Sequence, residues 1–395
     1  MKNVLVKSGL VVGVLVLVWS GIFAWKNLRG IGPAIGPIPS VSVNPTPENT
    51  TGLPLNLPEG FSVAYAAKDL PGARVIKQDS FGNIWVSRPV AGAISLLEIE
   101  NGVANHQSDI FQNLRKPHGL AFDPDFPTAL YITEEHRITR AHVYSEGGLE
   151  KIADLPTGGR HTNWTLGFGP DERLYVSLGS SCNVCNEKDR RRGTIQSMNR
   201  DGGDFKEVAK GLRNAPFFTW DPGTNKMWAT EMGRDLLGDD IPPDEINIIQ
   251  AGGDYGWPIC YGKNINDRDF DKNVYIQDPC TNRVPSHIDL PAHSAPLGLT
   301  FIPDAPAWPK EYRGNLLVAF HGSWNRSVPT GYKVIRMVLD RNGNPIKTED
   351  FISGWLTPKG EALGRPVDLL ATDKGELYIS DDKAGVVYRA LYTGN

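Results

Sequence analysis

A short hydrophobic pattern that recurs six times along the chain constrains the fold more than any other sequence feature. Each copy follows a turn and has an aliphatic residue or Met, usually an aromatic residue, another apolar residue and a small one. Five of the six copies carry Trp or Tyr in the second place. The copies are Ile84–Ser87, Leu130–Thr133, Leu174–Ser177, Met227–Thr230, Leu316–Ala319 and Leu377–Ser380.

Most copies follow an apolar run and a turn of Gly, Pro or Asp, as in residues 119–133, so each reads as the second strand of a β-hairpin. Their spacing is close to the about 40 to 50 residues of a four-stranded propeller blade, with insertions in the later copies. A solenoid would repeat at shorter and more even spacing, and a sandwich would not repeat its hairpins this closely. The sequence therefore predicts an all-β, six-bladed β-propeller, whose last strand at 386–392 pairs with residues 61–67 and closes the ring.

An apolar segment near the N-terminus predicts a transmembrane or signal helix. Ser8–Trp25 contains 18 residues without a charge, and Lys7 and Lys26 flank it. As a helix this run is about 27 Å long, enough to cross the hydrocarbon core of a bilayer. A cleaved signal peptide is the alternative, although Ile22 stands where a cut after Ala24 would favour a small residue.

These features divide the chain into three parts. Residues 1–29 form a signal anchor or signal peptide, residues 30–54 a Pro/Gly-rich linker, and residues 55–395 the propeller catalytic domain. Either form of the first part exports the chain, to the periplasmic or extracellular face, and an anchor would hold it at the cytoplasmic membrane. The net charge of −4 gives no basic face for nucleic acid.

Four cysteines agree with an oxidising compartment. Three pairings are possible, and the most local one joins Cys182 to Cys185 and Cys260 to Cys280. A four-thiolate zinc site is the alternative, but the second pair is too widely spaced for the usual ligand pattern.

Polar residues gather in the loops of one propeller face. The loop that enters a first strand and the loop that leaves a second strand share a face, because the two strands are antiparallel. The entering loops carry His118, Arg160, His161, Arg213, Asn214, His293 and Arg365, and the leaving loops are residues 179–193, 231–245, 321–327 and 381–385. Imidazole accepts protons near neutral pH, and arginines pair with carboxylates. The sequence predicts a general base, with His161 the strongest candidate, beside a pocket for an anion.

Several linked motifs resemble the soluble quinoprotein glucose dehydrogenases and, more closely, the L-sorbosone dehydrogenase-like group. They are GLRN at 211–214, EMGRD at 231–235, PPDEIN at 242–247, GGDYGWP at 252–258 and the run from HTNW to CNVC at 161–185. The similarity covers about residues 53–392. It implies a six-bladed propeller that binds pyrroloquinoline quinone (PQQ) through Ca²⁺, oxidises an aldose or sugar aldehyde, and passes electrons to a separate acceptor.

The resemblance also implies roles for individual residues. His161 matches the base that removes the sugar hydroxyl proton, and Arg365 matches an arginine that binds a cofactor carboxylate. Arg213 and Asn214 match groups that contact the quinone oxygens. Arg160, beside His161 on the same face, is a further candidate for binding the cofactor because of its charge, not because of the resemblance. The backbone carbonyls of Gly233 and Arg234 match ligands of the cofactor's Ca²⁺, and Asp244, Glu245 and Tyr255 are candidates for a second, structural Ca²⁺.

Three positions depart from the family pattern. Ser180 stands where the glucose enzymes have an acid that orients the catalytic histidine, Met232 replaces an amide, and Val367 replaces a second carboxylate-binding arginine. Two other functions stay open, and Ser180 and Val367 motivate the first of them. One is a non-catalytic propeller binding module, and the other is a Ca²⁺-dependent propeller lactonase, which would need side-chain carboxylates and amides around a channel metal.

Overall fold

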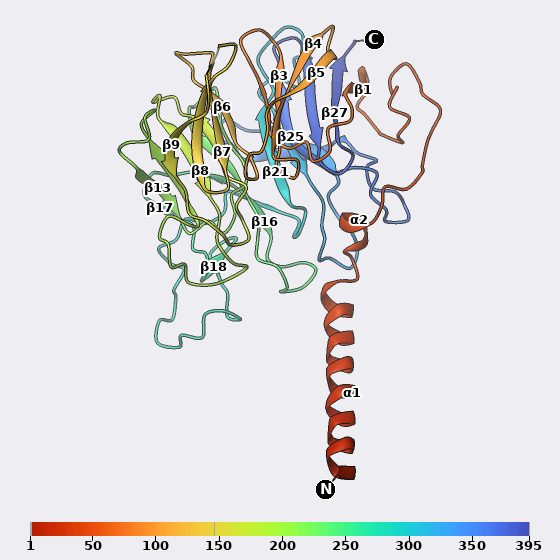
Figure 1. The fold of residues 1–395 in the computed structure, drawn as a ribbon, viewed down its shortest axis with the longest axis vertical. Helices are drawn as coiled ribbons and strands as arrows, with labels where there is room; N and C mark the ends of the chain where they lie inside the picture. The colour runs from red at the N-terminus through yellow and green to blue at the C-terminus, as the bar shows by residue number, and fades with distance from the viewer. Residues whose placement is uncertain (1, 146, 395) are drawn as a thin grey trace.

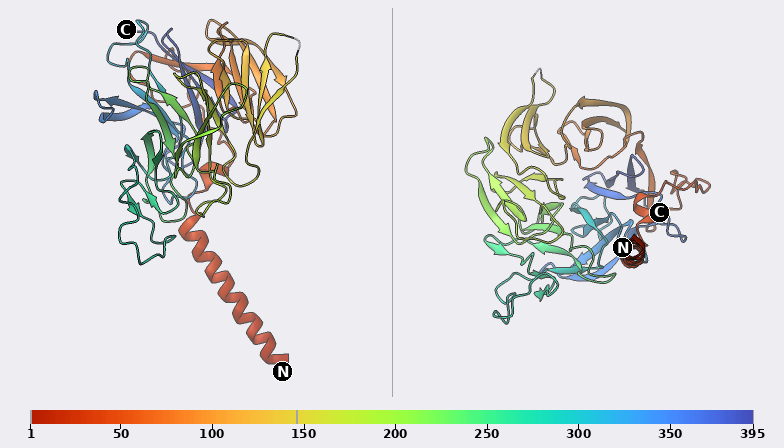
Figure 2. Two further views of the ribbon diagram at one scale, coloured as in Figure 1. Left: turned by 90° about the vertical axis from the view of Figure 1, so that its left-hand side faces the viewer. Right: turned by 60° about the horizontal axis from the view of Figure 1, so that its bottom comes forward.

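The strands of this protein form six sheets arranged radially, as the views in Figures 1 and 2 show. The structure is a computed structural model that describes residues 2–145 and 147–394, without the side chains of residues 2–10 and 27. Each of these six sheets has four strands except one, which has five, and a further small sheet has two. The prediction of a six-bladed β-propeller is confirmed.

The first three blades follow one another along the chain, each built from successive antiparallel strands. Blade 1 contains β2 (Ile76–Gln78), β3 (Ile84–Arg88), β4 (Ala93–Glu100) and β5 (Val103–Phe111). Blade 2 contains β6 (Leu120–Phe122), β7 (Ala129–Glu134), β8 (Arg137–His142) and β9 (Glu150–Asp154). Blade 3 contains β10 (Thr165–Phe168), β11 (Leu174–Leu178), β12 (Thr194–Met198), β13 (Lys206–Lys210) and, parallel to β13, β17 (Gly253–Asp254).

The remaining blades include the long insertion. Blade 4 contains β14 (Phe218–Trp220), β15 (Met227–Glu231), β16 (Asp244–Ile248) and β20 (Ile288–Leu290). Between its last two strands lie β17 and the small sheet of β18 (Cys260–Tyr261) and β19 (Ile265–Asn266). Blade 5 contains β21 (Pro296–Phe301), β22 (Leu316–Phe320), β23 (Lys333–Leu339) and β24 (Pro345–Ile352), and blade 6 contains β25 (Pro366–Ala371), β26 (Glu376–Asp381), β27 (Val386–Tyr392) and β1 (Phe61–Ala67).

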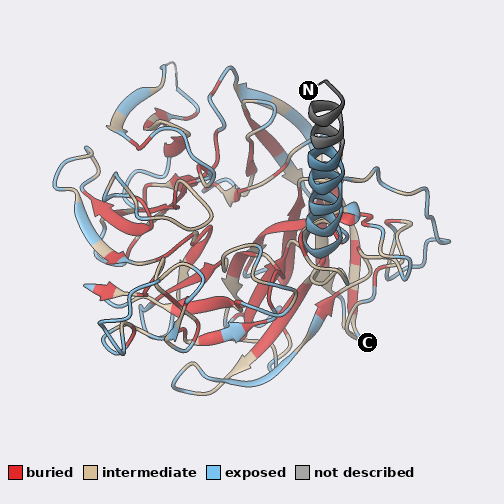
Figure 3. Cartoon of the chain, turned by 90° about the horizontal axis from the view of Figure 1, so that it is seen from below, coloured by how far each residue is buried: buried red, intermediate tan, exposed pale blue. Residues whose placement is uncertain are grey.

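Where the repeated pattern carries an aromatic residue, the ring packs its blade against a neighbouring blade. All six copies lie in the second strands of the blades, which are β3, β7, β11, β15, β22 and β26. The ring centroid of Tyr131 lies 5.2 Å from that of Phe168 in blade 3, and the Trp228 ring lies 5.6 Å from Phe301 in blade 5. A large ring on alternate positions of a strand fills the wedge between two sheets, which explains why the pattern recurs. Figure 3 shows the resulting buried strands, with exposed loops at the edge.

The ring closes by pairing the first propeller strand with the last. β1 runs antiparallel to β27, with Phe61 opposite Tyr392, as the sequence predicts. Both disulfides also form in the predicted pairing, Cys182 with Cys185 and Cys260 with Cys280. The thiolate zinc site is therefore excluded, because neither pair offers a free thiolate.

Two helices precede the propeller. α1 (Lys2–Asn27) projects away from it, and α2 (Gly32–Ile35) lies beside it (Figures 1 and 2). The Pro/Gly-rich linker contacts the propeller: the Lys383 amine donates to the Gly36 carbonyl at 2.5 Å. Among the residues whose side chains are described, no helix has the length and apolarity to cross a membrane, and the predicted run from Ser8 begins outside them.

Candidate active site

A cavity of about 300 Å³ lies where the loops of blades 3 to 6 meet on one face. This volume is at the lower end of the range for small-molecule sites. Loops that enter first strands and loops that leave second strands both contribute to it. Its lining residues are His161, Arg213, Asn214, Met232, Gly233, Asp235, Asp244, His293, Ala295, His321, Trp324, Asn325 and Arg365.

His161 precedes β10, and residues that follow β11 hold its ring. Its Nδ1 lies 3.1 Å from the carbonyl oxygen of Ser180 and 2.9 Å from the Ser180 hydroxyl. Because a carbonyl oxygen can only accept, Nδ1 carries the hydrogen. Nε2 is therefore unprotonated in the neutral ring, which is the state a general base requires.

The same surroundings keep His161 neutral. Burial, followed by the nearby positive charge of Arg213, lowers the pKa of His161 from 6.5 to about 3. Ser180 brings no negative charge to oppose these effects, because its hydroxyl is uncharged. The hydroxyl and carbonyl of Ser180 orient the ring, and the hydrogen bond to the carbonyl raises the pKa of His161 by less than burial and Arg213 lower it.

Arg213 is buried and makes four hydrogen bonds. Its Nε donates to the carbonyl of Asn183 and its Nη1 to the carbonyl of Met232. Its Nη2 donates to the Asn183 side-chain oxygen and to the Asp235 carboxylate, both at 2.9 Å. A guanidinium has five N–H groups, so one hydrogen on Nη1 remains for a ligand.

Arg365 has more donors free than Arg213. Its Nε and Nη2 donate to the carbonyls of His321 and Gly322, at 3.0 and 2.7 Å. Its Nη1 has no partner among the described residues, so it can bind an anion in the cavity. Val367, which replaces the second arginine of the family pattern, is fully buried in the core.

His321 and Asp382 form a second histidine site that the sequence analysis missed. His321 Nε2 lies 2.9 Å from an oxygen of Asp382, and Arg74 contacts the other oxygen at 2.5 Å. Burial, then Arg365, lowers the pKa of His321 to about 4. The segments HGSWNRS and DDKAG place both residues on the cavity face, but only the structure shows that they pair across two blades.

The backbone carbonyl oxygens of Gly233 and Arg234 are suitable ligands for a hard cation. Neither carbonyl accepts a hydrogen bond from a residue that the structure describes. Asp244 Oδ1 accepts from the Gly233 amide at 2.9 Å, and its Oδ2 accepts from the Ala295 amide at 2.8 Å. Burial raises the pKa of Asp244 to about 7. Ca²⁺ prefers oxygen ligands such as these free carbonyls.

Asp244 and Glu245 face different cavities. Asp244 lines the main cavity, whereas Glu245 lines a smaller one with Glu231 and Tyr255. One oxygen of Glu231 is buried and has no partner in the described chain. Burial, then the charge of Glu245, raises the pKa of Glu231. Glu231 and Glu245 are thus neighbouring buried carboxylates on the smaller cavity, and Asp244 faces the main one.

Arg160 directly precedes His161, and its positive charge contributes to lowering the pKa of His161. The Arg160 side chain is exposed and does not line the cavity. His118 is also outside the cavity lining, since it is buried with Nδ1 3.3 Å from the Trp164 carbonyl. His293 does line the cavity, and its Nε2 lies 2.7 Å from the Gly238 carbonyl.

The donor set of the main cavity fits a calcium-bound quinone that carries carboxylates. Free guanidinium hydrogens on Arg213 and Arg365 suit carboxylate and quinone oxygens. The unpaired carbonyls of Gly233 and Arg234 suit the cation. Asn325 adds a buried side-chain oxygen that has no partner among the described residues.

The fold and this cavity define a six-bladed propeller with histidines and arginines lining a cavity on one face. The chain belongs to the TrAA12-like family, whose family model matches residues 55–391. An uncharacterized protein of Borreliella burgdorferi is 30% identical over 360 residues, which is 86% of this chain and 91% of that protein. Quinoprotein glucose dehydrogenase B of Acinetobacter calcoaceticus is 25% identical over 45% of this chain and 48% of its own.

Solved structures share the fold at lower identity. The holo form of the pyranose dehydrogenase PQQ domain from Coprinopsis cinerea has a TM-score of 0.73 and 20% identity, with 88% of this chain and 100% of that one covered. The calcium structure of a Trichoderma reesei AA12 enzyme has a TM-score of 0.72 and 20% identity, with 89% and 99% covered.

Proposed function

We propose that this protein is a PQQ- and Ca²⁺-dependent sugar dehydrogenase that oxidises an aldose or a sugar aldehyde of the glucose or sorbosone type. One observation carries the proposal: a neutral histidine with a free Nε2 lines the same cavity as two arginines with free donors. The Acinetobacter relative is a quinoprotein glucose dehydrogenase, and the Coprinopsis neighbour is a pyranose dehydrogenase PQQ domain. Both support a sugar substrate.

The cofactor would be held by groups that the structure leaves free. Arg365 would bind one of its carboxylates, and Arg213 and Asn214 would contact its quinone oxygens. The carbonyls of Gly233 and Arg234 would hold Ca²⁺. When bound, PQQ supplies the acceptor for the hydride that leaves the sugar carbon.

The protein's own residues accept a proton and hold the groups of the site in fixed positions. His161 Nε2 takes the proton of the sugar hydroxyl, and the Ser180 carbonyl and hydroxyl keep the hydrogen of Nδ1 in place. Asp244 accepts hydrogen bonds from the amides of Gly233 and Ala295, which both line the cavity. A preorganised site of this kind avoids reorganisation during the reaction.

The experiment is dye-linked oxidation of a panel of aldoses and sugar aldehydes by apo-protein supplied with PQQ and CaCl₂. We expect activity only when both are present. His161→Gln should keep PQQ binding and lose oxidation. Absence of both binding and activity in the wild type would contradict the proposal. Sugar binding with an unchanged quinone spectrum would indicate a binding module, and lactone hydrolysis without quinone would indicate a lactonase.

We further propose that the chain acts outside the cytoplasm and passes electrons to a separate acceptor, a quinone or a cytochrome. Its two disulfides support an oxidising compartment. Exposed apolar side chains along α1, such as Leu17 and Trp25, support attachment to the cytoplasmic membrane. Cell fractionation of the full chain tests this placement, and recovery in the cytoplasm would contradict it.

A further inference from the structure

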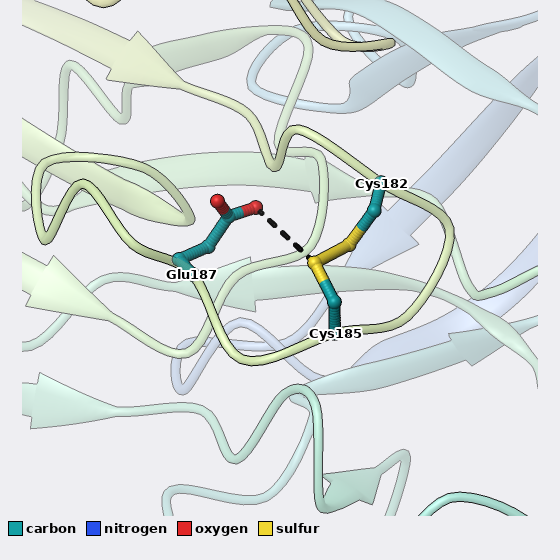
Figure 4. Close-up of side chains that lie close together, drawn as sticks. All are labelled: Cys182, Cys185 and Glu187. Carbon is teal, nitrogen blue, oxygen red and sulfur yellow. Dashed lines mark hydrogen bonds between the residues drawn. A yellow bond between two sulfur atoms is a disulfide. The ribbon is translucent and has the colours of Figure 1, made fainter.

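The loop that leaves β11 contains a four-residue ring closed by a disulfide. Cys182 and Cys185 are joined in this ring, and Figure 4 shows the Glu187 side chain beside it. The Glu187 carboxylate accepts from the amide and the hydroxyl of Ser181, at 2.5 and 2.8 Å. Because both sulfurs are bonded to each other, this cluster is not a metal site. It is instead a rigid loop at the edge of the cavity.

One side of the ring holds the histidine. The Ser180 hydroxyl donates to the carbonyl of Cys182 at 2.7 Å. Having given its only hydrogen to that carbonyl, the hydroxyl can only accept from His161 Nδ1, 2.9 Å away. The ring therefore sets the direction of the hydroxyl that orients His161.

The other side of the ring holds the arginine. The carbonyl and the side-chain oxygen of Asn183 accept from Nε and Nη2 of Arg213, both at 2.9 Å. The same side-chain oxygen accepts from the Asp235 amide at 2.8 Å, and Asn183 Nδ2 donates to the Asp235 carbonyl at 3.0 Å. Asp235 in turn pairs with Arg213. Asn183 thus joins the arginine to the acidic loop that follows β15.

The size of the ring indicates a local role. The stabilisation that a disulfide gives a fold grows with the logarithm of the number of residues in the loop it closes, so short loops give the least. The two cysteines of the ring are 3 residues apart, whereas Cys260 and Cys280 are 20 apart. The smaller ring contributes less to global stability but fixes the atoms that contact Ser180 and Arg213.

We propose that Asn183, held in the Cys182–Cys185 ring, is a positioning residue for Arg213, and that the ring orients both polar groups of the cavity. The catalytic consequence rests on the proposed function above. Asn183 accepts two of the five guanidinium hydrogens of Arg213, and Asp235, which Asn183 holds, accepts a third. The ring thereby directs the remaining Nη1 hydrogen to the ligand.

The first test needs no cofactor. The ring is opened in the full chain with Cys182→Ser and Cys185→Ser, and solvent exchange of the Arg213 Nε–H is followed by ¹H–¹⁵N NMR of arginine-labelled apo-protein. The signal is assigned by its absence in Arg213→Lys. We expect at least about tenfold faster exchange in the opened ring, because the hydrogen bond to Asn183 then opens more often. Unchanged exchange would overturn the inference.

The second test measures PQQ affinity with Ca²⁺ by quenching of tryptophan fluorescence. Asn183→Ala should weaken binding about 10- to 100-fold, as expected for loss of a hydrogen bond to a charged group. Val184→Ala lies in the same ring and makes no hydrogen bond to Arg213, so we expect a change below about threefold. Equal affinities in these two variants would refute the role of Asn183.

Two controls separate the possible failures. If the wild type binds no PQQ, the proposed function fails, while Arg213 exchange still decides whether the ring holds the arginine. Thermal unfolding checks the fold of each variant. Removal of Cys260–Cys280 should lower the Tm more than opening the small ring, and the reverse order would contradict the local role.

Discussion

Replacing Ser180 with Asp should restore an ordinary basicity to His161. The Ser180 hydroxyl lies 2.9 Å from His161 Nδ1, so an Asp carboxylate at this position would lie beside the ring. Two charges about 4 Å apart interact by about 4 kcal/mol at an effective dielectric constant of about 20. At 1.36 kcal/mol for each pKa unit, this is about 3 units. The pKa of His161, now about 3, should rise to about 6.

The assay is the pH dependence of kcat/KM for sugar oxidation, together with an NMR titration of the His161 ring in apo-protein. In the wild type, His161 stays neutral through the physiological range and contributes no loss of activity above about pH 4. In Ser180→Asp, activity should fall as the pH drops through about 6, because the ring takes up a proton and can no longer act as a base. The His161 resonance is assigned from His161→Gln.

Ser180→Asn is the matched control. Its amide has the same shape as the carboxylate, can donate to the Cys182 carbonyl as Ser180 does, and adds no charge. It should leave the pKa of His161 low. If the ring still titrates below about pH 4 in Ser180→Asp while the fold is intact, the electrostatic reasoning is refuted. If Ser180→Asn shifts the titration equally, geometry rather than charge sets the basicity.

Four further outcomes are expected. His161→Gln should lower kcat about 10²- to 10⁴-fold with PQQ affinity retained, as measured by dye reduction and fluorescence quenching. Because the pKa of His321 is lowered to about 4, the folded state loses roughly 3 kcal/mol of stability as the pH falls from about 6.5 to 4. Denaturant unfolding at several pH values should show that His321→Gln lacks this part of the acid sensitivity. Ca²⁺ at about 100 times its Kd should raise the Tm by roughly 5 °C in the wild type and by much less in Glu245→Gln, as measured by calorimetry. Trp228→Ala should cost about 3 to 5 kcal/mol in chemical unfolding, because it empties the contact between blades 4 and 5.

The architecture could be predicted because it depends on local patterns. The repeated strand pattern marks a position that must fill the wedge between neighbouring blades, so its count equals the number of blades. Turn residues and antiparallel pairing then decide which loops share a face. The pairing of β1 with β27 follows because an open ring would leave two unpaired edges.

The details of the site depend on contacts between loops of different blades. Nothing in the sequence near His321 indicates that its partner is Asp382, which lies in another blade. Because side chains alternate along a strand, Asp244 and Glu245 of β16 point to opposite sides and line different cavities. In the sequence, two adjacent acids suggest a single site. Arg160 was grouped with the arginines of the cavity from its neighbour in sequence, but its side chain is exposed.

The closure of the ring has a consequence for when this chain can fold. Ser62 donates to the carbonyl of Leu391, a partner 329 residues away, so blade 6 needs both ends of the propeller. A nascent chain still attached to the ribosome cannot complete this blade until β27 has emerged. Contacts of such long range fold slowly. The closed ring therefore forms only after β27 is available, so it stays open while the earlier blades are being synthesised.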